Sequence, residues 1–170
     1  MDLKAYIRDI PDFPKPGIMF KDITPLLKSP EAFGEATRQL GKIAKGLRPD
    51  KIVAVESRGF IFGAALALAL KCSLVPVRKP GKLPYKTHRE TYELEYGTDS
   101  LEIHTDAIAK GDRVLLIDDL LATGGTLAAS ARLIKRLGGE VVGILTVVEL
   151  SFLKGREKLK GLPYHTLIEY

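Results

Sequence analysis

The feature that most constrains the fold is a regular alternation of continuously apolar segments with helical segments. Parallel strands that are buried on both faces read as continuous apolar runs, and the helices between them supply right-handed crossovers. The sequence therefore predicts an α/β fold, with a doubly wound parallel sheet and helices on both of its faces. The expected strands are residues 51–55, 73–78, 112–118 and 140–150, and the expected crossover helices are residues 59–70 and 125–137.

Two further regions lie outside this core. Residues 3–10 are expected to form a short helix, and the three prolines that follow predict an extended, stiff loop. A longer helix is expected from Ser29 and Pro30, as N-cap and first turn. Its inner face should carry Leu40, Ile43, Ala44 and Leu47.

An inserted flap is expected between about residues 82 and 105. There the apolar runs give way to period-two alternation in YELEY and DSLEIH, a pattern typical of an antiparallel hairpin. The chain has 170 residues, of which 45% are hydrophobic, enough for one sizeable core. We find no internal repeat or low-complexity linker, so we expect a single domain over residues 1–170.

The charge pattern favours a small polyanionic substrate over a nucleic acid. The formal net charge is +5, but the basic residues form no helical stripe interleaved with aromatic residues. Five of them cluster within residues 78–89: Arg78, Lys79, Lys82, Lys86 and Arg89. The basic segment 154–161, in contrast, is interpreted as a solvated turn without a functional role.

The sequence also favours a cytoplasmic protein without a membrane span. Its longest apolar run, residues 60–70, is about half the length that a bilayer requires, and the first ten residues contain acidic side chains rather than an apolar signal core. The single cysteine, Cys72, is interpreted as a small buried hydrophobic residue.

The segment VLLIDDLLATGGT, residues 114–126, suggests a ligand site. It places Asp118 and Asp119 at the end of a predicted strand, and ligands of open α/β sheets bind outside such ends. The next residues lead into a helix, so that backbone N–H groups, hydroxyls and the helix N-terminus converge on an anion. This phosphate cradle comprises Ala122, Thr123, Gly124, Gly125 and Thr126.

Two carboxylates repel a phosphate, so they are expected to face another part of the same ligand. Vicinal sugar hydroxyls are donors that need acceptors, and the predicted ligand is therefore a sugar phosphate. The glycines are not followed by the lysine of a P-loop, and GFIFG after the first core strand is not the dinucleotide-binding pattern.

Residues 114–126 closely resemble the phosphoribosyl-pyrophosphate motif of the type I phosphoribosyltransferases. Other segments resemble the adenine phosphoribosyltransferase branch of that family, in the same order along the chain: residues 13–27, 56–63, 78–84, 92–97 and 153–159. The resemblance implies purine salvage, in which phosphoribosyl pyrophosphate and adenine give AMP and pyrophosphate. It also implies a homodimer, with the acids on the ribose hydroxyls and residues 122–126 on the 5′-phosphate.

The resemblance assigns the N-terminal loop to the base. Met19, Phe20 and Lys21 would contact adenine, with Met19 packed on the ring and the Lys21 backbone reading its edge. Glu95 would manage the proton on adenine N7 from the flap, and Tyr96 would help to close that flap.

The same resemblance assigns the leaving group to two loops. Ser57 and Arg58 would hold pyrophosphate, with a cis peptide before the serine, and Lys79 and Lys82 would bind it from the basic loop. Mg²⁺ would enter with the substrate, bridging pyrophosphate and ribose oxygens, rather than occupy a site built by the protein alone. Because positive charge builds on the ribose as pyrophosphate departs, catalysis requires a neutralised leaving group and exclusion of water.

Three alternatives remain open at this stage. An enzyme for a 6-oxopurine would need a side chain for the O6 acceptor, commonly a lysine, where this chain has Val147, Val148 and Glu149. A regulator that senses phosphoribosyl pyrophosphate would need a DNA-binding domain, and only about 50 residues precede the first core strand. A pyrophosphokinase that makes the substrate would need an ATP site and a much longer chain.

Overall fold

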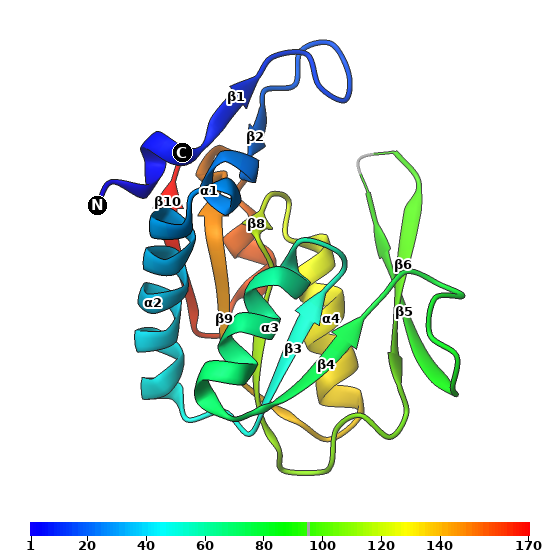
Figure 1. Ribbon diagram of the computed structural model, residues 1–170. Helices are drawn as coiled ribbons and strands as arrows, with labels where there is room; N and C mark the ends of the chain where they lie inside the picture. Colours follow the sequence, from blue (N-terminus) through cyan, green and yellow to red (C-terminus); the bar gives the residue numbers. More distant parts are fainter. Residues whose placement is uncertain (95) are drawn as a thin grey trace.

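A parallel sheet forms the centre of the computed structural model, which describes residues 1–94 and 96–170 (Figure 1). Its order is β10-β9-β7-β3-β4, and the two-residue strand β8 pairs with the end of β9. This architecture confirms the predicted α/β class. The bounds are β3 (Lys51–Val55), β4 (Ser73–Val77), β7 (Arg113–Ile117), β8 (Leu120–Leu121), β9 (Glu140–Glu149) and β10 (Tyr164–Glu169).

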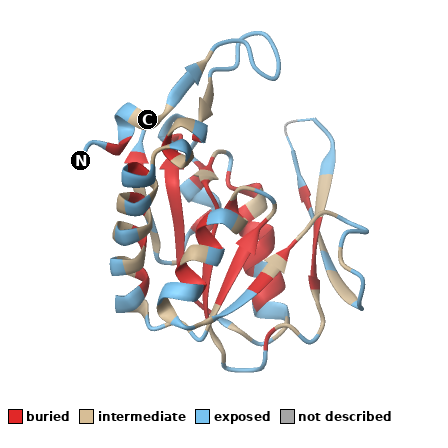
Figure 2. Ribbon diagram, viewed as in Figure 1, coloured by how far each residue is buried: buried red, intermediate tan, exposed pale blue. Residues whose placement is uncertain are grey.

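Helices cover both faces of the sheet, as the apolar strands require. Helices α2 (Pro30–Leu47) and α3 (Gly59–Leu70) lie on one face, and α4 (Gly125–Arg136) lies on the other. Along β3, Ile52 and Ala54 pack with the α2 and α3 layer, whereas Val53 and Val55 pack with α4. Figure 2 shows the buried residues concentrated in the strands and on the helix faces that meet them.

Helix α2 begins and packs largely as its sequence indicates. The Ser29 hydroxyl accepts a hydrogen bond from the Ala32 backbone N–H at 3.2 Å. Leu40 and Ala44 are fully buried, while Ile43 and Leu47 are half-buried. The short helix α1 (Thr24–Lys28) precedes it. Within the described residues, no helix combines the length and apolarity that a membrane span requires.

Two antiparallel hairpins project beyond the edge where the core strands end, one on each side of it (Figure 1). One consists of β1 (Arg8–Ile10) and β2 (Phe20–Asp22). The other consists of β5 (Thr87–Glu93) and β6 (Thr98–His104), and it is the flap expected from the alternating pattern. The two hairpins thus lie on either side of the strand ends.

The predictions for the N-terminus were partly wrong. Instead of one helix over residues 3–10, a 3₁₀ turn covers Leu3–Tyr6 and strand β1 follows. The physical reason is cross-strand charge pairing: Arg8 contacts Asp22 at 2.7 Å and Lys21 contacts Asp9 at 2.6 Å. The proline-rich segment, expected to be extended, instead forms a loop of turns and bends that closes the β1–β2 hairpin.

The C-terminal prediction was also incomplete. Strand β10 was not expected, and the basic segment 154–161 is not simply solvated: the 3₁₀ turn Gly155–Leu159 buries Leu159 in the core cluster shared with α4. A second turn, Ser151–Leu153, precedes it. Cys72 is half-buried rather than buried, and its thiol donates to the Pro49 carbonyl at 3.1 Å.

Candidate active site

The ends of β3 and β7 converge on one cavity. The two strands are adjacent and parallel, and the crossovers that follow them cover opposite faces of the sheet. Such a switch point is where open α/β sheets bind ligands. The cavity has a volume of about 420 Å³ and includes the predicted residues Ser57, Arg58, Lys79, Asp118, Asp119 and Thr126 in its lining.

Asp118 and Asp119 form a buried acidic pair at the end of β7. Their exposed fractions are 9% and 4%, and the Asp119 backbone N–H donates to Asp118 Oδ1 at 2.8 Å. Burial raises the pKa of Asp118 well above its ordinary value, and the neighbouring Asp119 charge raises it further. Burial also raises the pKa of Asp119, while Arg58 opposes that shift.

Arg58 contacts this pair from the loop after β3. Its Nε lies 2.8 Å from Asp119 Oδ2, yet that buried oxygen has no hydrogen-bond partner in suitable geometry among the described residues. A buried acceptor without a partner is costly, and a ligand donor or cation would satisfy it. Arg58 also lies over the Phe20 ring, 5.3 Å from its centroid.

The loop before α4 forms a second, smaller hollow that shares Asp118 and Thr126 with the main cavity. It encloses about 80 Å³ and is lined in part by Ala122, Thr123 and Gly124. Gly124 has φ of +84°, which favours glycine, and a Cβ there would lie 2.5 Å from the Gly155 carbonyl oxygen. Helix α4 therefore begins at a tight turn, which is the geometry expected for the predicted phosphate cradle.

The Glu56–Ser57 peptide bond is cis, as the resemblance implied. Immediately beyond it, α3 starts so close to β7 that a Cβ on Gly59 would lie 3.0 Å from Asp118 Oδ1. The loop after β3 is thereby packed directly against the acidic pair.

Lys79 lies in the cavity lining but is engaged by the flap. Its ammonium group pairs with Asp99 of β6 and lies 3.5 Å from the Tyr92 hydroxyl of β5. The Tyr92 hydroxyl also accepts a hydrogen bond from Thr126 Oγ1 at 3.2 Å. The flap thus contacts both a predicted pyrophosphate residue and a predicted phosphate residue.

Among the described residues, the predicted Met19, Phe20, Lys21, Lys82 and Tyr96 are not part of the cavity lining. Met19, Lys82 and Tyr96 are exposed, with 46% of Met19 and 84% of Tyr96 accessible to solvent. The Lys21 side chain pairs with Asp9 and lies over the Tyr170 ring, which leaves only its backbone for a base. Glu95 lies outside the described residues.

Sequence reasoning missed three residues beside the cavity. Glu56 accepts the Lys79 backbone N–H and pairs with Arg78 at 3.2 Å, which joins the loops after β3 and β4. Tyr92 and Asp99 reach Lys79 from the flap. Glu56 could have been recognised from the sequence, because it is a polar residue directly after a buried strand. Tyr92 and Asp99 could not, because only the hairpin register places them opposite each other.

Comparison with known proteins identifies the family. Residues 23–164 match the family model described as a phosphoribosyl transferase domain. Adenine phosphoribosyltransferases from Kosmotoga olearia and Thermotoga maritima are 56% and 58% identical to the chain over its full length, covering 100% and 98% of their own lengths. The chain belongs to the adenine phosphoribosyltransferase family. The resemblance seen in the sequence is therefore confirmed.

Solved structures of this family share the fold. The crystal structure of the Thermoanaerobacter pseudethanolicus enzyme matches with a TM-score of 0.97 at 56% identity, covering 99% of this chain and 98% of that one. The Saccharomyces cerevisiae enzyme, complexed with an imino-altritol bisphosphate and adenine, matches with a TM-score of 0.90 at 44% identity. That match covers 98% of this chain and 96% of the yeast chain.

Proposed function

We propose that the chain transfers the 5-phosphoribosyl group from phosphoribosyl pyrophosphate to adenine, giving AMP and pyrophosphate in purine salvage. The observation that carries this proposal is the convergence of the Arg58–Asp119 contact with the hollow before α4 at one switch point. One ligand with a ribose, a 5′-phosphate and a second anionic group would engage all of these features. The family relatives bear the name of this activity.

The acidic pair would bind the ribose. Asp118 and Asp119 present carboxylate oxygens at the strand end, and the 2′ and 3′ hydroxyls would donate to them. The 5′-phosphate would then lie in the hollow lined by Ala122, Thr123, Gly124 and Thr126. The N–H groups at the start of α4, which begins at Gly125, favour an anion there.

Arg58, Ser57 and Lys79 would bind the pyrophosphate, with Lys82 reaching it from the exposed part of the basic loop. As the bond between ribose C1′ and the pyrophosphate oxygen breaks, negative charge grows on the leaving group and positive charge on the ribose. Fixed cations beside the oxygen and carboxylates beside the sugar stabilise both. Bond formation from adenine N9 to C1′ then completes the transfer.

The donor set also fits Mg²⁺ carried by the substrate. Carboxylate oxygens are the hard ligands that Mg²⁺ prefers, and Asp118 and Asp119 both line the cavity. Bound Mg²⁺ would neutralise pyrophosphate charge, while Asp118 and Asp119 orient the ribose hydroxyls.

The base would enter beside the β1–β2 hairpin. Phe20 lies over Arg58 at the cavity, so closure of the hairpin would bring Met19 onto the ring and the Lys21 backbone to its edge. From the flap, Glu95 would take the N7 proton, and Tyr96 would close over the site. Glu95→Gln should lower kcat more than it raises either KM; an unchanged kcat would remove Glu95 from the chemistry.

We also propose a cytoplasmic homodimer. Helix α3 is apolar on its outer face as well as its inner one: Ile61 and Leu68 are 38% and 84% exposed, two turns apart, and Leu74 of β4 is 42% exposed. Exposed apolar side chains gathered on one face mark interaction surfaces, and a second copy would cover them. Sedimentation of the wild type and of Leu68→Lys tests this arrangement; two monomeric samples would contradict it.

The deciding experiment offers the purified protein phosphoribosyl pyrophosphate, Mg²⁺ and a panel of bases: adenine, hypoxanthine, guanine, xanthine and orotate. AMP from adenine alone is the expected product. A nucleotide from another base would keep the mechanism and overturn the specificity. Binding of phosphoribosyl pyrophosphate without any product would instead favour the sensor alternative.

A further inference from the structure

The basic segment that follows β9 interlocks with the phosphate cradle. A Cβ on Gly155 would collide with the Ala122 carbonyl oxygen and come within 2.9 Å of Leu121 Cδ1. From the other side, a Cβ on Gly124 would lie 2.5 Å from the Gly155 carbonyl oxygen. The two backbones are therefore packed without room for a side chain, and a shift of Gly155 must shift the cradle.

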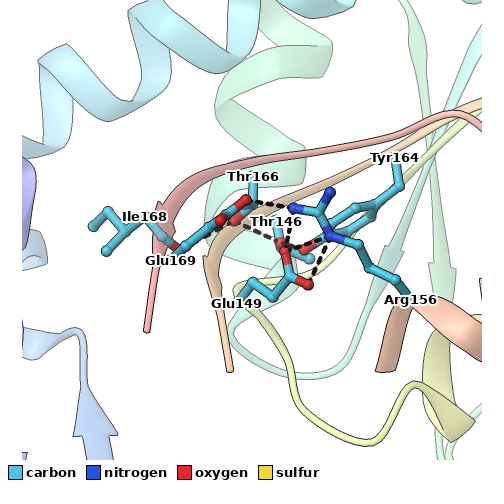
Figure 3. Close-up of polar contacts among 7 residues, drawn as sticks. All are labelled: Thr146, Glu149, Arg156, Tyr164, Thr166, Ile168 and Glu169. Carbon is cyan, nitrogen blue, oxygen red and sulfur yellow. Dashed lines mark hydrogen bonds and ion pairs between the residues drawn. The ribbon is translucent and has the colours of Figure 1, made fainter. Parts of the chain in front are cut away.

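One arginine fixes this segment to the sheet (Figure 3). Arg156 Nε lies 2.7 and 2.8 Å from the two oxygens of Glu149, and its terminal nitrogen lies 2.5 Å from Glu149 Oε2 and from Glu169 Oε1. The guanidinium also lies over the Tyr164 ring, 4.9 Å from its centroid. Such a fork fixes direction as well as distance, which a lysine cannot reproduce.

Glu149 is well placed to carry this constraint to the cradle. It is 2% exposed and ends β9, where it lies opposite Leu121 of β8. Leu121 directly precedes the cradle and accepts a hydrogen bond from the Leu150 backbone N–H at 2.9 Å. The cradle is thus held between β9 on one side and Gly155 on the other, and both are joined by Arg156.

We propose that Arg156 is a positioning residue for the 5′-phosphate: its fork on Glu149 holds Gly155 against the loop 122–126 and so sets the direction of the phosphate-binding N–H groups. The proposal rests on the proposed function. It assigns a role to a segment whose charges the sequence pattern left without one. Arg156 acts through the backbone, and the phosphate-binding groups themselves belong to the cradle.

Arg156→Lys tests the proposal, because lysine keeps the charge and loses the fork. We expect the KM for phosphoribosyl pyrophosphate to rise about tenfold, while kcat and the KM for adenine change less than about twofold. Arg38→Lys is the matched control, since Arg38 forks onto Glu35 at 2.7 and 2.8 Å on the exposed side of α2. The proposal would be overturned if Arg156→Lys and Arg38→Lys had the same kinetic constants. It would also be overturned if Arg156→Lys impaired kcat and the KM for adenine as much as the KM for phosphoribosyl pyrophosphate.

Gly155→Ala tests the same contact with the loop 122–126 and leaves the Arg156–Glu149 ion pair unchanged. Its added methyl should weaken binding of ribose 5-phosphate about tenfold by calorimetry, whereas Gly34→Ala, with open space at its Cβ, should leave it unchanged. Unchanged affinity in folded Gly155→Ala would also reject the proposal. Ribose 5-phosphate binding needs no turnover, so a wild type that binds it but makes no AMP refutes the proposed function and not this inference.

Discussion

Arg58 Nε lies 2.8 Å from Asp119 Oδ2 and thereby joins the loop after β3 to the end of β7. The contact is asymmetric, because Arg58 is partly exposed to the cavity while the Asp119 side chain is 6% exposed. Asp119 is thus held by the arginine on one side and available to a ligand on the other. If Asp119 binds the ribose and Arg58 the leaving group, as proposed, this pair would couple the two.

Arg58→Gln should therefore impair binding of both the ribose and the leaving group. We expect kcat/KM for phosphoribosyl pyrophosphate to fall about a hundredfold, because a cation is lost beside the leaving group and Asp119 loses its neighbour. Steady-state kinetics with adenine saturating would measure it. Arg132→Gln is a suitable control, since Arg132 pairs with Glu90 at 2.6 Å on the flap side of α4 and should lose less than about twofold. Similar losses in both variants would argue against a role for Arg58 in the site.

Replacing the acidic pair should abolish turnover and preserve the fold. Asp118→Asn combined with Asp119→Asn keeps the shape of both side chains but removes the charges that would hold the ribose and stabilise its developing cation. We expect kcat to fall at least about a thousandfold, with an unchanged circular dichroism spectrum. Retained turnover in a folded double variant would exclude the proposed ribose contacts.

The pH dependence of stability should report the same pair. Burial raises the pKa of both groups above the ordinary value of 3.8, so the folded chain binds their protons more tightly than the unfolded chain does. The free energy of unfolding must then fall as pH rises from about 3.8 through the raised folded pKa values, and level off above them. The double asparagine variant lacks these groups and should lack this component.

Urea denaturation of wild type and double variant from about pH 4 to about pH 7 would measure the difference. The stability of the wild type relative to the variant should decrease with rising pH. A difference that stays constant, or that grows with pH, would show that the pair is not perturbed in the stated direction.

The sequence predicted the core, and it predicted a glycine turn into a helix where the structure has a hollow, because both depend on local patterns. Buried parallel strands must be apolar along their whole length, and an anion site at a helix start needs small residues such as Gly124 and Gly125. The first hairpin could not be predicted in this way, since β1 and β2 are three residues long and are stabilised by the pairs Arg8–Asp22 and Lys21–Asp9, whose partners are distant in sequence.

The same limit applies within the site. Asp99 and Lys79 are 20 residues apart and meet only because the flap folds back on the core, so neither residue type nor spacing revealed the pair. The contacts of segment 154–161 were missed for a related reason. Its charges are typical of a solvated turn, and only the folded chain brings Arg156 to Glu149 and Glu169.

Release of the flap contact should strengthen pyrophosphate binding. Because Asp99 neutralises Lys79, the bound anion must displace it, and Asp99→Asn removes that competition. We expect the dissociation constant for pyrophosphate to fall about threefold, which is the range for partly exposed ion pairs. Calorimetry measures it, with Glu90→Gln as a control for loss of a flap carboxylate. A weaker affinity for pyrophosphate would mean that Asp99 assists binding. An unchanged affinity would mean that Asp99 does not compete with the anion for Lys79.

The close packing of α3 on β3 should make the free energy of unfolding sensitive to a single added methyl group. A Cβ on Gly63 of α3 would lie 2.6 Å from the Ala54 Cβ of β3, and neither Cβ can move without its own backbone. Gly63→Ala should therefore lower the free energy of unfolding by about 1–3 kcal/mol, because the overlap outweighs the helix propensity gained. Gly41→Ala is the control: its Cβ would meet only Leu66 Cδ2 at 3.7 Å, an ordinary contact, so this variant should be stabilised by up to about 1 kcal/mol. Urea denaturation of both variants would separate packing from propensity, and a stabilised Gly63→Ala would show that α3 can shift away from β3 without penalty.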